Sequence, residues 1–207
     1  MYPDWLDWTQ RLAAIAQTGL FYTQDVFDKE RYEQIREIAA EIAAAHTDSE
    51  AEAIADLFAR DSGYSTPKVD MRAVIFQDDK VLLVREIADG GWALPGGWAD
   101  VGEPPSVGVV REVREEAGYE CRATRLLAVY DHRHPRHGHA YYMYHSFKLF
   151  FLCELTGGEP TTSIETDGVG FFPVDDLPEL SVMRVTAGQI RRFYAMAQDP
   201  ALPADFD

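Results

Sequence analysis

Residues 97–119 read GWADVGEPPSVGVVREVREEAGY, and they are the most informative part of the chain. A proline is well tolerated in the first turn of a helix, so the sequence predicts a helix that begins at Pro105. Gly118 suits the position just after the last turn, where a positive φ is common. The preceding WALP is typical of a short strand that leads into the Gly96-Gly97 turn. A strand, a turn and a helix in this order predict a helix packed on a sheet.

Carboxylates and apolar side chains occupy different faces of this predicted helix. At about 100° per residue, Glu112, Glu115 and Glu116 fall within one turn. The apolar stripe is expected on nearly the opposite side and comprises Val107, Val110, Val113 and Ala117. Three like charges spaced i, i+3 and i+4 destabilise a helix by about 0.2–0.5 kcal/mol per pair unless something offsets them. Taken alone, EVREE is typical of a solvated acidic face.

A divalent cation is the other interpretation, and the surroundings of the helix favour it. Hard cations such as Mg²⁺ prefer oxygen ligands, and proteins often hold them with one or two carboxylates. Glu112 and Glu116 lie one turn apart and are the predicted ligands. The carbonyl of Gly97, in the preceding glycine turn, is expected to add another ligand.

The same stretch resembles the signature of the Nudix hydrolases, G-x5-E-x7-R-E-U-x-E-E-x-G-U, where U is a bulky aliphatic residue. The positions in register are Gly97, Glu103, Arg111, Glu112, Val113, Glu115, Glu116 and Gly118. Only Tyr119 departs from the pattern, at a position that serves packing. The resemblance implies hydrolysis of a nucleoside diphosphate linked to another moiety, X, with Mg²⁺ or Mn²⁺ as the metal.

The resemblance also implies roles for individual residues. Glu112 and Glu116 would be metal ligands, and Glu115 would be either a ligand or the base that activates water. Arg111 would orient its neighbours rather than react, and Glu103 would lie beside it. Glu165, in the loop TTSIETDGVGFF, is either a catalytic base outside the signature or a solvated loop acid.

Outside this stretch, the sequence divides into a helical part and an α/β part. Residues 1–62 predict three helices; the first is expected to end at Gly19, the second to be capped by Asp28, and the third to begin with a Ser49–Glu52 capping box. The polar segment DSGYSTPK is the expected boundary, which gives domains at 1–62 and 67–207. Beyond it, strands are expected at 69–75, VLLVRE, 125–131, 145–155 and a final GVGFFPVDDL, with a helix near 185–198. The predicted fold is a three-helix unit followed by an α/β/α sandwich on a mixed sheet.

Residues 5–44 resemble the helical extension of a Nudix subgroup described as ADP-ribose pyrophosphatase-like, which also includes CDP-choline pyrophosphatases. The resemblance implies a homodimer, with ADP-ribose as the first choice of substrate and CDP-choline as the second. Trp5, Trp8 and Tyr22 either pack in the helical unit or stack on a base from the partner subunit. A non-catalytic nucleotide sensor and an RNA-processing enzyme are the competing functions.

Residues 131–145, DHRHPRHGHAYYMYH, hold five of the six histidines of the chain. Residues 122–153 carry five basic residues and one acidic residue, a local net charge of +4. Three interpretations stay open: a Zn²⁺ site, an incidental exposed loop, and a loop that contacts the substrate. In the third case, the expected contacts come from Arg133, Arg136, His132 and Tyr142.

The whole chain of 207 residues has a net charge of −16, which disfavours binding to nucleic acid or to anionic membranes. An acidic protein binds a diphosphate only with the help of cations, in agreement with the predicted metal site. The first residues, MYPDWLDWTQ, lack the basic region of a signal peptide, and no apolar run is long enough to span a bilayer. We therefore expect a cytoplasmic protein whose two cysteines are free thiols.

Overall fold

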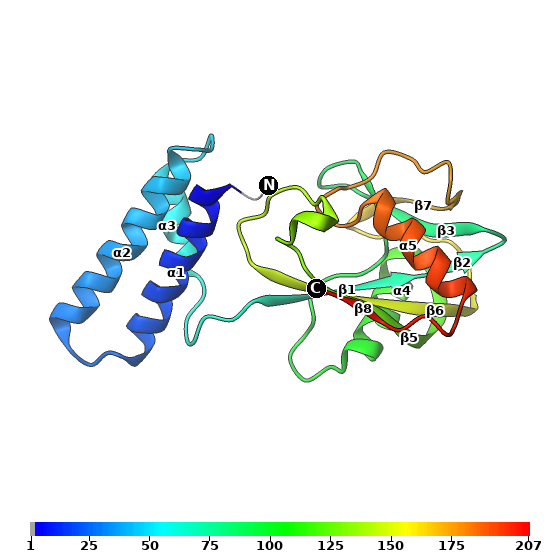
Figure 1. Ribbon diagram of the computed structural model, residues 1–207, viewed down its shortest axis with the longest axis horizontal. Coiled ribbons are helices and arrows are strands. Elements are labelled where there is room, and N and C mark those ends of the chain that lie inside the picture. Colours follow the sequence, from blue (N-terminus) through cyan, green and yellow to red (C-terminus); the bar gives the residue numbers. More distant parts are fainter. Residues whose placement is uncertain (1–2) are drawn as a thin grey trace. The chain divides into compact units, whose positions relative to one another are not determined.

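The computed structural model describes residues 3–207, which form two compact units (Figure 1). One unit comprises residues 3–67 together with 143–145, and the other comprises residues 68–142 and 146–207. Within the described residues, no helix combines the length and the apolar character needed to cross a membrane.

The first unit contains three helices, α1 (Asp4–Tyr22), α2 (Val26–Ala44) and α3 (Ala51–Ala59). The expected end of α1 at Gly19 is wrong, because the helix continues to Tyr22. A side chain at Gly19 would collide with the Tyr32 ring at 2.3 Å, so this glycine allows α1 and α2 to pack closely. The expected caps are also wrong. Asp25, not Asp28, accepts the first N–H groups of α2, and α3 begins without a side-chain cap.

The second unit is a mixed α/β fold, as expected. One sheet has the strand order β1-β6-β5-β8 and the other has the order β2-β3-β4, with β7 pairing with β3. Their bounds are β1 Lys68–Val74, β2 Phe76–Gln77, β3 Lys80–Glu86, β4 Trp92–Ala93, β5 Tyr119–Asp131, β6 Ser146–Gly158, β7 Thr166–Pro173 and β8 Asp205–Phe206. β5 and β6 are longer than expected because they pair with each other along nearly their whole length. β7 is not the last strand, since β8 follows it.

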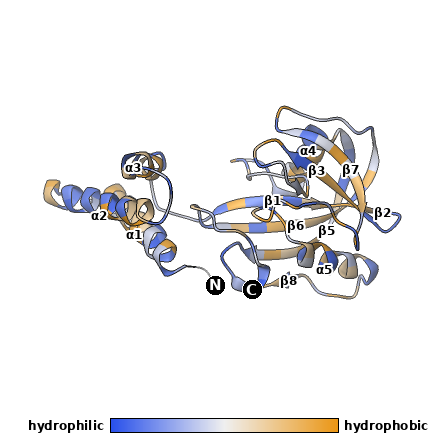
Figure 2. Cartoon of the chain, turned by 90° about the horizontal axis from the view of Figure 1, so that it is seen from above, coloured by the Kyte–Doolittle hydropathy of each residue, from blue (hydrophilic) through white to orange (hydrophobic). Residues whose placement is uncertain are grey.

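Two helices cover the sheets from opposite sides, α4 (Pro105–Ala117) and α5 (Ala187–Gln198) (Figure 2). Side chains alternate along each strand, so β3 contributes Leu82 and Val84 to the core beneath α4. On the opposite face of β3, Val81 and Leu83 join the core beneath α5. The sheets are therefore buried on both faces, and α4 packs against strands that also carry charged residues.

Candidate active site

The ends of α4 are set by local sequence. Pro105 stands in the first turn, and Gly118 follows the last turn with a φ of 75° and donates its N–H to the Arg114 carbonyl. A side chain at Gly118 would approach the Glu159 carbonyl to 2.4 Å, so both the backbone conformation and the available space require glycine. Val109, Val113 and Ala117 are completely buried and fix the rotation of the helix about its axis.

The buried face of α4 includes Glu116, which is a correction to the expected separation of apolar and acidic stripes. Val107, assigned to the apolar stripe, is 53 % exposed, whereas Glu116 is only 5 % exposed. On the helical wheel the buried arc runs from Glu116 through Val109 and Val113 to Ala117. One of the three carboxylates therefore lies in the protein interior, and its charge needs a specific partner there.

The Gly96-Gly97 turn supplies the first partner. The Gly96 N–H donates to Glu116 Oε2 at 2.8 Å. A side chain at Gly96, whose φ is 144°, would collide with the Met71 carbonyl of β1, so the turn fits against the strand only as glycine. A side chain at Gly97 would lie 3.2 Å from Glu112 Oε1. The two glycines therefore bring the turn close to both predicted metal ligands. The Gly97 carbonyl itself accepts the Met71 N–H at 2.8 Å.

Arg111 gathers the remaining carboxylates of the signature. Its guanidinium donates to Glu103 at 3.0 Å and to Glu115 at 2.8 Å, and it lies 3.0 Å from Glu112 Oε1. Asp100, which the sequence analysis did not name, accepts at 3.1 Å. Hydrogen bonds to Glu103 raise the pKa of Arg111, so the guanidinium stays charged at any ordinary pH. Four carboxylates around one cation give this cluster an excess of negative charge.

Burial makes two of these carboxylates hard to ionise. Desolvation raises the pKa of Glu112, and it raises the pKa of Glu116 to about 7. The positive charge of Arg72 acts in the opposite direction on both groups. A second cation beside Glu112 and Glu116 would stabilise their ionised forms. Closely spaced carboxylate oxygens of this kind fit a hard divalent cation such as Mg²⁺ or Mn²⁺.

A network of buried charges on β1, β3 and β6 lies near the carboxylates of α4, and the sequence pattern did not predict it. Arg72 is 6 % exposed; it donates to Asp70 at 2.9 Å and lies 3.8 Å from Glu86. Lys148 pairs with Asp70 within the interior, and Glu86 also receives Arg184 at 2.8 Å. The available signal was a charged residue inside each of three apolar strands, VDMRAV, VLLVRE and SFKLFF.

The loop that carries Glu165 is tied to the end of α4. Thr166 donates its hydroxyl to the Glu116 carbonyl at 2.8 Å, and the Thr161 N–H donates to the Ala117 carbonyl at 3.1 Å. Glu165 itself is exposed, and because it adjoins Thr166 its main chain lies next to the C-terminal end of α4.

The basic side chains of segment 122–153 already have partners in the folded protein, and most of these partners are acids. Arg122 donates to Glu154 at 2.8 Å, and Lys148 pairs with Asp70. Arg136 lies 3.5 Å from Asp205 and 3.3 Å from Asp207. Arg133 faces Asp131 at 3.6 Å, and Arg125 donates to main-chain carbonyls. The local charge of +4 counts only residues close in sequence, and the folded protein does not present it as an anion-binding patch.

In the histidine-rich loop, residues 131–145, His132 is buried, whereas Tyr142 lies beside the ring of Trp98. His132 is 4 % exposed, and burial lowers its pKa to about 4, so its imidazole is neutral and faces the interior. We therefore do not retain His132 in the proposed substrate site. Tyr142 lies beside Trp98, which follows the Gly97 turn, with ring centroids 6.3 Å apart and ring planes 20° apart. Trp98 is 43 % exposed.

Comparison with known proteins decides the family. A model described as the NUDIX domain matches residues 66–193, more than half of the chain. The chain belongs to the Nudix family. As a Nudix pyrophosphohydrolase it matches a second model, described as a UDP-X-like N-terminal oligomerisation domain, over residues 3–58. This assignment favours an enzyme over the non-catalytic nucleotide sensor.

Similar proteins of this family include full-length relatives. YjhB of Bacillus subtilis, whose name assigns it provisionally to the ADP-ribose pyrophosphatases, is 42 % identical over 98 % of this chain and 97 % of its own. An ADP-ribose pyrophosphatase structure from Streptococcus suis is 43 % identical with a TM-score of 0.62, over 69 % of this chain and 100 % of its own. A UDP-X diphosphatase structure is 35 % identical with a TM-score of 0.64, over 99 % of this chain and 98 % of its own.

Proposed function

We propose that this Nudix pyrophosphohydrolase cleaves the diphosphate of ADP-ribose, using a divalent cation held by α4. The observation that carries the reaction class is the carboxylate cluster around Arg111, with Glu116 buried at one edge. The ADP-ribose assignment is supported by the full-length likeness to YjhB. The UDP-X diphosphatase, which is similar over 99 % of this chain, supports a UDP-linked compound as the competing substrate class.

The proposed mechanism gives each residue a position. Glu112 and Glu116 would hold the cation, with Glu115 and the Gly97 carbonyl as further candidate ligands. When bound, the cation orients the attacking water, lowers its pKa and neutralises charge on the diphosphate oxygens. Arg111 keeps Glu112 and Glu115 in place through contacts of 3.0 and 2.8 Å, while Glu103 holds the guanidinium from its other side. Glu115 and Glu165 are both candidates for the base that takes the proton of the water.

A panel of substrates tests this assignment. With Mg²⁺ present, ADP-ribose, UDP-glucose, CDP-choline and nucleoside triphosphates are compared by kcat/KM, and the products are identified. We expect ADP-ribose to be preferred by about tenfold or more and to give AMP and ribose 5-phosphate. A preference for UDP-glucose or CDP-choline would overturn the ADP-ribose assignment but not the reaction class. Failure to cleave any of the three diphosphate compounds would overturn the proposed function itself.

Trp98 and Tyr142 are the proposed contacts for the nucleobase. Their nearly parallel rings lie 6.3 Å apart beside the Gly97 turn, and stacking on an aromatic ring contributes about 1–3 kcal/mol per base. We expect Trp98→Ala to raise KM by about five- to 100-fold while changing kcat less, and Trp98→Phe to retain most of the affinity. Steady-state kinetics on the preferred substrate measures both values. An unchanged KM in Trp98→Ala would remove the base-stacking role.

Arg133 and Arg136 stay predicted substrate contacts of lower priority, since both already face acids.

The oligomerisation-domain match supports a homodimer formed through the helical unit. Several large apolar side chains on α1 and at the start of α2 are more than half exposed, namely Trp8, Ile15, Phe21, Tyr22, Val26 and Phe27. A second copy of the chain would cover part of this surface. Light scattering on the full-length protein should give the mass of two chains, and a monomer at micromolar concentration would contradict the proposal.

A further inference from the structure

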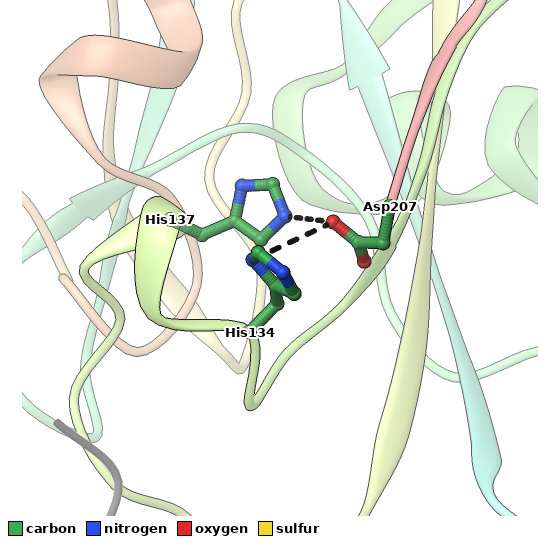
Figure 3. Close-up of side chains that lie close together, drawn as sticks. All are labelled: His134, His137 and Asp207. Atoms are coloured by element: carbon green, nitrogen blue, oxygen red, sulfur yellow. Dashed lines mark hydrogen bonds and ion pairs between the residues drawn. The ribbon is translucent and has the colours of Figure 1, made fainter.

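A second cluster of metal-ligating side chains lies outside the signature and uses none of its residues. His134, His137 and Asp207 each offer one ligand atom, and the three atoms all lie within 4.8 Å of one another. His137 Nε2 lies 2.7 Å from Asp207 Oδ1, and His134 Nδ1 lies 3.9 Å from the same oxygen. Figure 3 shows both imidazoles meeting at the Asp207 carboxylate.

The local backbone brings the two histidines to one side. Pro135–His137 form a short 3₁₀ helix, η1, with His134 at its N-cap. His137 is the last residue of this turn, and its imidazole centroid lies 5.6 Å from that of His134, so the two rings stand side by side. Gly138 ends the turn with a φ of 66°. The spacing HPRH therefore predisposes this part of the loop to bind a ligand between two imidazoles.

The third ligand comes from the far end of the sequence. β8 pairs with β5 through Asp205 and Phe206, which carries Asp207 to the start of the histidine loop. The main-chain N–H of Asp131 donates to Asp207 Oδ2, so the other oxygen, Oδ1, is left facing the imidazoles. The Asp207 side chain is 21 % exposed and that of His134 is 44 % exposed, so water can reach the cluster and complete a coordination shell.

We propose that His134, His137 and Asp207 form a binding site for one first-row divalent ion of borderline softness, such as Zn²⁺. Ligand atoms about 2.0–2.1 Å from a tetrahedral Zn²⁺ are about 3.3 Å apart, and the separations of 2.7 and 3.9 Å from Asp207 Oδ1 to the two imidazole nitrogens bracket this value. Two imidazole nitrogens, one carboxylate oxygen and water are a common ligand set for zinc. The inference does not depend on the proposed ADP-ribose activity.

The hydrogen bonds and ion pairs around the cluster can be rearranged to admit Zn²⁺. His137 Nε2 and Asp207 Oδ1, 2.7 Å apart, now share a hydrogen bond; with the single proton of a neutral His137 on Nδ1, Nε2 would present its lone pair to Zn²⁺ and this hydrogen bond would be lost. Zn²⁺ would displace three contacts of Arg136: its Nε lies 3.3 Å from Asp207 Oδ1 and 3.4 Å from His137 Nε2, and its main-chain N–H donates to His134 Nδ1 at 3.4 Å. Its Nη2 already donates to the Phe206 carbonyl at 3.0 Å and lies 3.5 Å from Asp205, so the guanidinium has other partners.

Zinc binding to the full-length protein tests the proposal, with Mg²⁺ in large excess to occupy the α4 carboxylates. Calorimetry should show one Zn²⁺ per chain. Co²⁺ bound in its place should give the visible absorption of a tetrahedral site. His134→Ala and Asp207→Asn should each weaken Zn²⁺ binding by about tenfold or more. Glu116→Gln and His46→Ala, which removes an exposed histidine of the helical unit, should leave it unchanged.

Two results would overturn the proposal. One is Zn²⁺ binding by His134→Ala as tight as that of the unmodified protein. The other is loss of Zn²⁺ binding in Glu116→Gln, which would place the ion at α4 instead. The His134 side chain is 44 % exposed and lies in a loop, so thermal unfolding of His134→Ala without metal should match that of the unmodified protein and exclude a folding defect.

Discussion

Replacing Glu116 by glutamine is expected to lower kcat by about 100- to 10,000-fold without unfolding the protein. Stabilisation of transition-state charge by a bound metal contributes several kcal/mol, and each 1.36 kcal/mol corresponds to about tenfold in rate. The amide has nearly the same volume as the carboxylate, and its oxygen can still accept the Gly96 N–H that Glu116 accepts at 2.8 Å. The variant therefore removes a charge from the site and little else.

Glu120→Gln is the matched control, because Glu120 is exposed and lies beyond the end of α4. It should leave kcat unchanged at saturating Mg²⁺. Circular dichroism and thermal unfolding establish that both variants are folded. Near-full activity of Glu116→Gln would show that α4 does not bind the catalytic metal through this residue.

The second large effect is on stability in the absence of metal. Burial raises the pKa of Glu116 from 4.5 to about 7. Between these values the folded protein holds a proton that the unfolded chain has lost, so Glu116 makes the free energy of unfolding fall as pH rises from about 4.5 to about 7. A shift of this size corresponds to about 3 kcal/mol once the pH is well above 7. Glu116→Gln should therefore be the more stable protein at pH 8, although it is nearly inactive.

Urea unfolding of both proteins in EDTA, repeated from pH 5 to pH 8, measures this difference. Subtracting one curve from the other cancels the groups that titrate in both proteins. The advantage of Glu116→Gln should grow with pH and level off above about 7. A difference that stays constant across this range would mean that Glu116 is ionised in the folded protein throughout. With Mg²⁺ present, the advantage should shrink because the cation stabilises the ionised form.

The features predicted correctly from sequence depend on neighbours along the chain. α4 begins at Pro105 and is followed by Gly118 in a left-handed conformation, as the local pattern predicts. The N-cap of α2 is not decided by local sequence, because Asp25 and Asp28, one turn apart, are both suitable capping residues. The loop near Glu116 depends on Thr166, fifty positions away, and no local rule connects these two residues.

The buried charges show why part of the candidate site could not be predicted. The alternation of β1 was recognised, but it does not reveal that Asp70 and Arg72 face the interior. Their partners, Lys148 and Glu86, come from strands that pair with or pack beside β1 only in the folded protein. For the same reason, the excess of positive charge counted along 122–153 is offset only in the folded protein, where Asp70 joins Lys148, Glu154 joins Arg122, and Asp205 and Asp207 join Arg136.

Binding of Mn²⁺ to the full-length protein, followed by electron paramagnetic resonance, tests the central claim most directly. The claim is that Glu112 and Glu116 hold the catalytic cation on α4. The unmodified protein and His134→Ala should bind Mn²⁺ equally well, while Glu112→Gln and Glu116→Gln should each bind it about tenfold more weakly or worse. Equal Mn²⁺ affinity in all four proteins would contradict the claim.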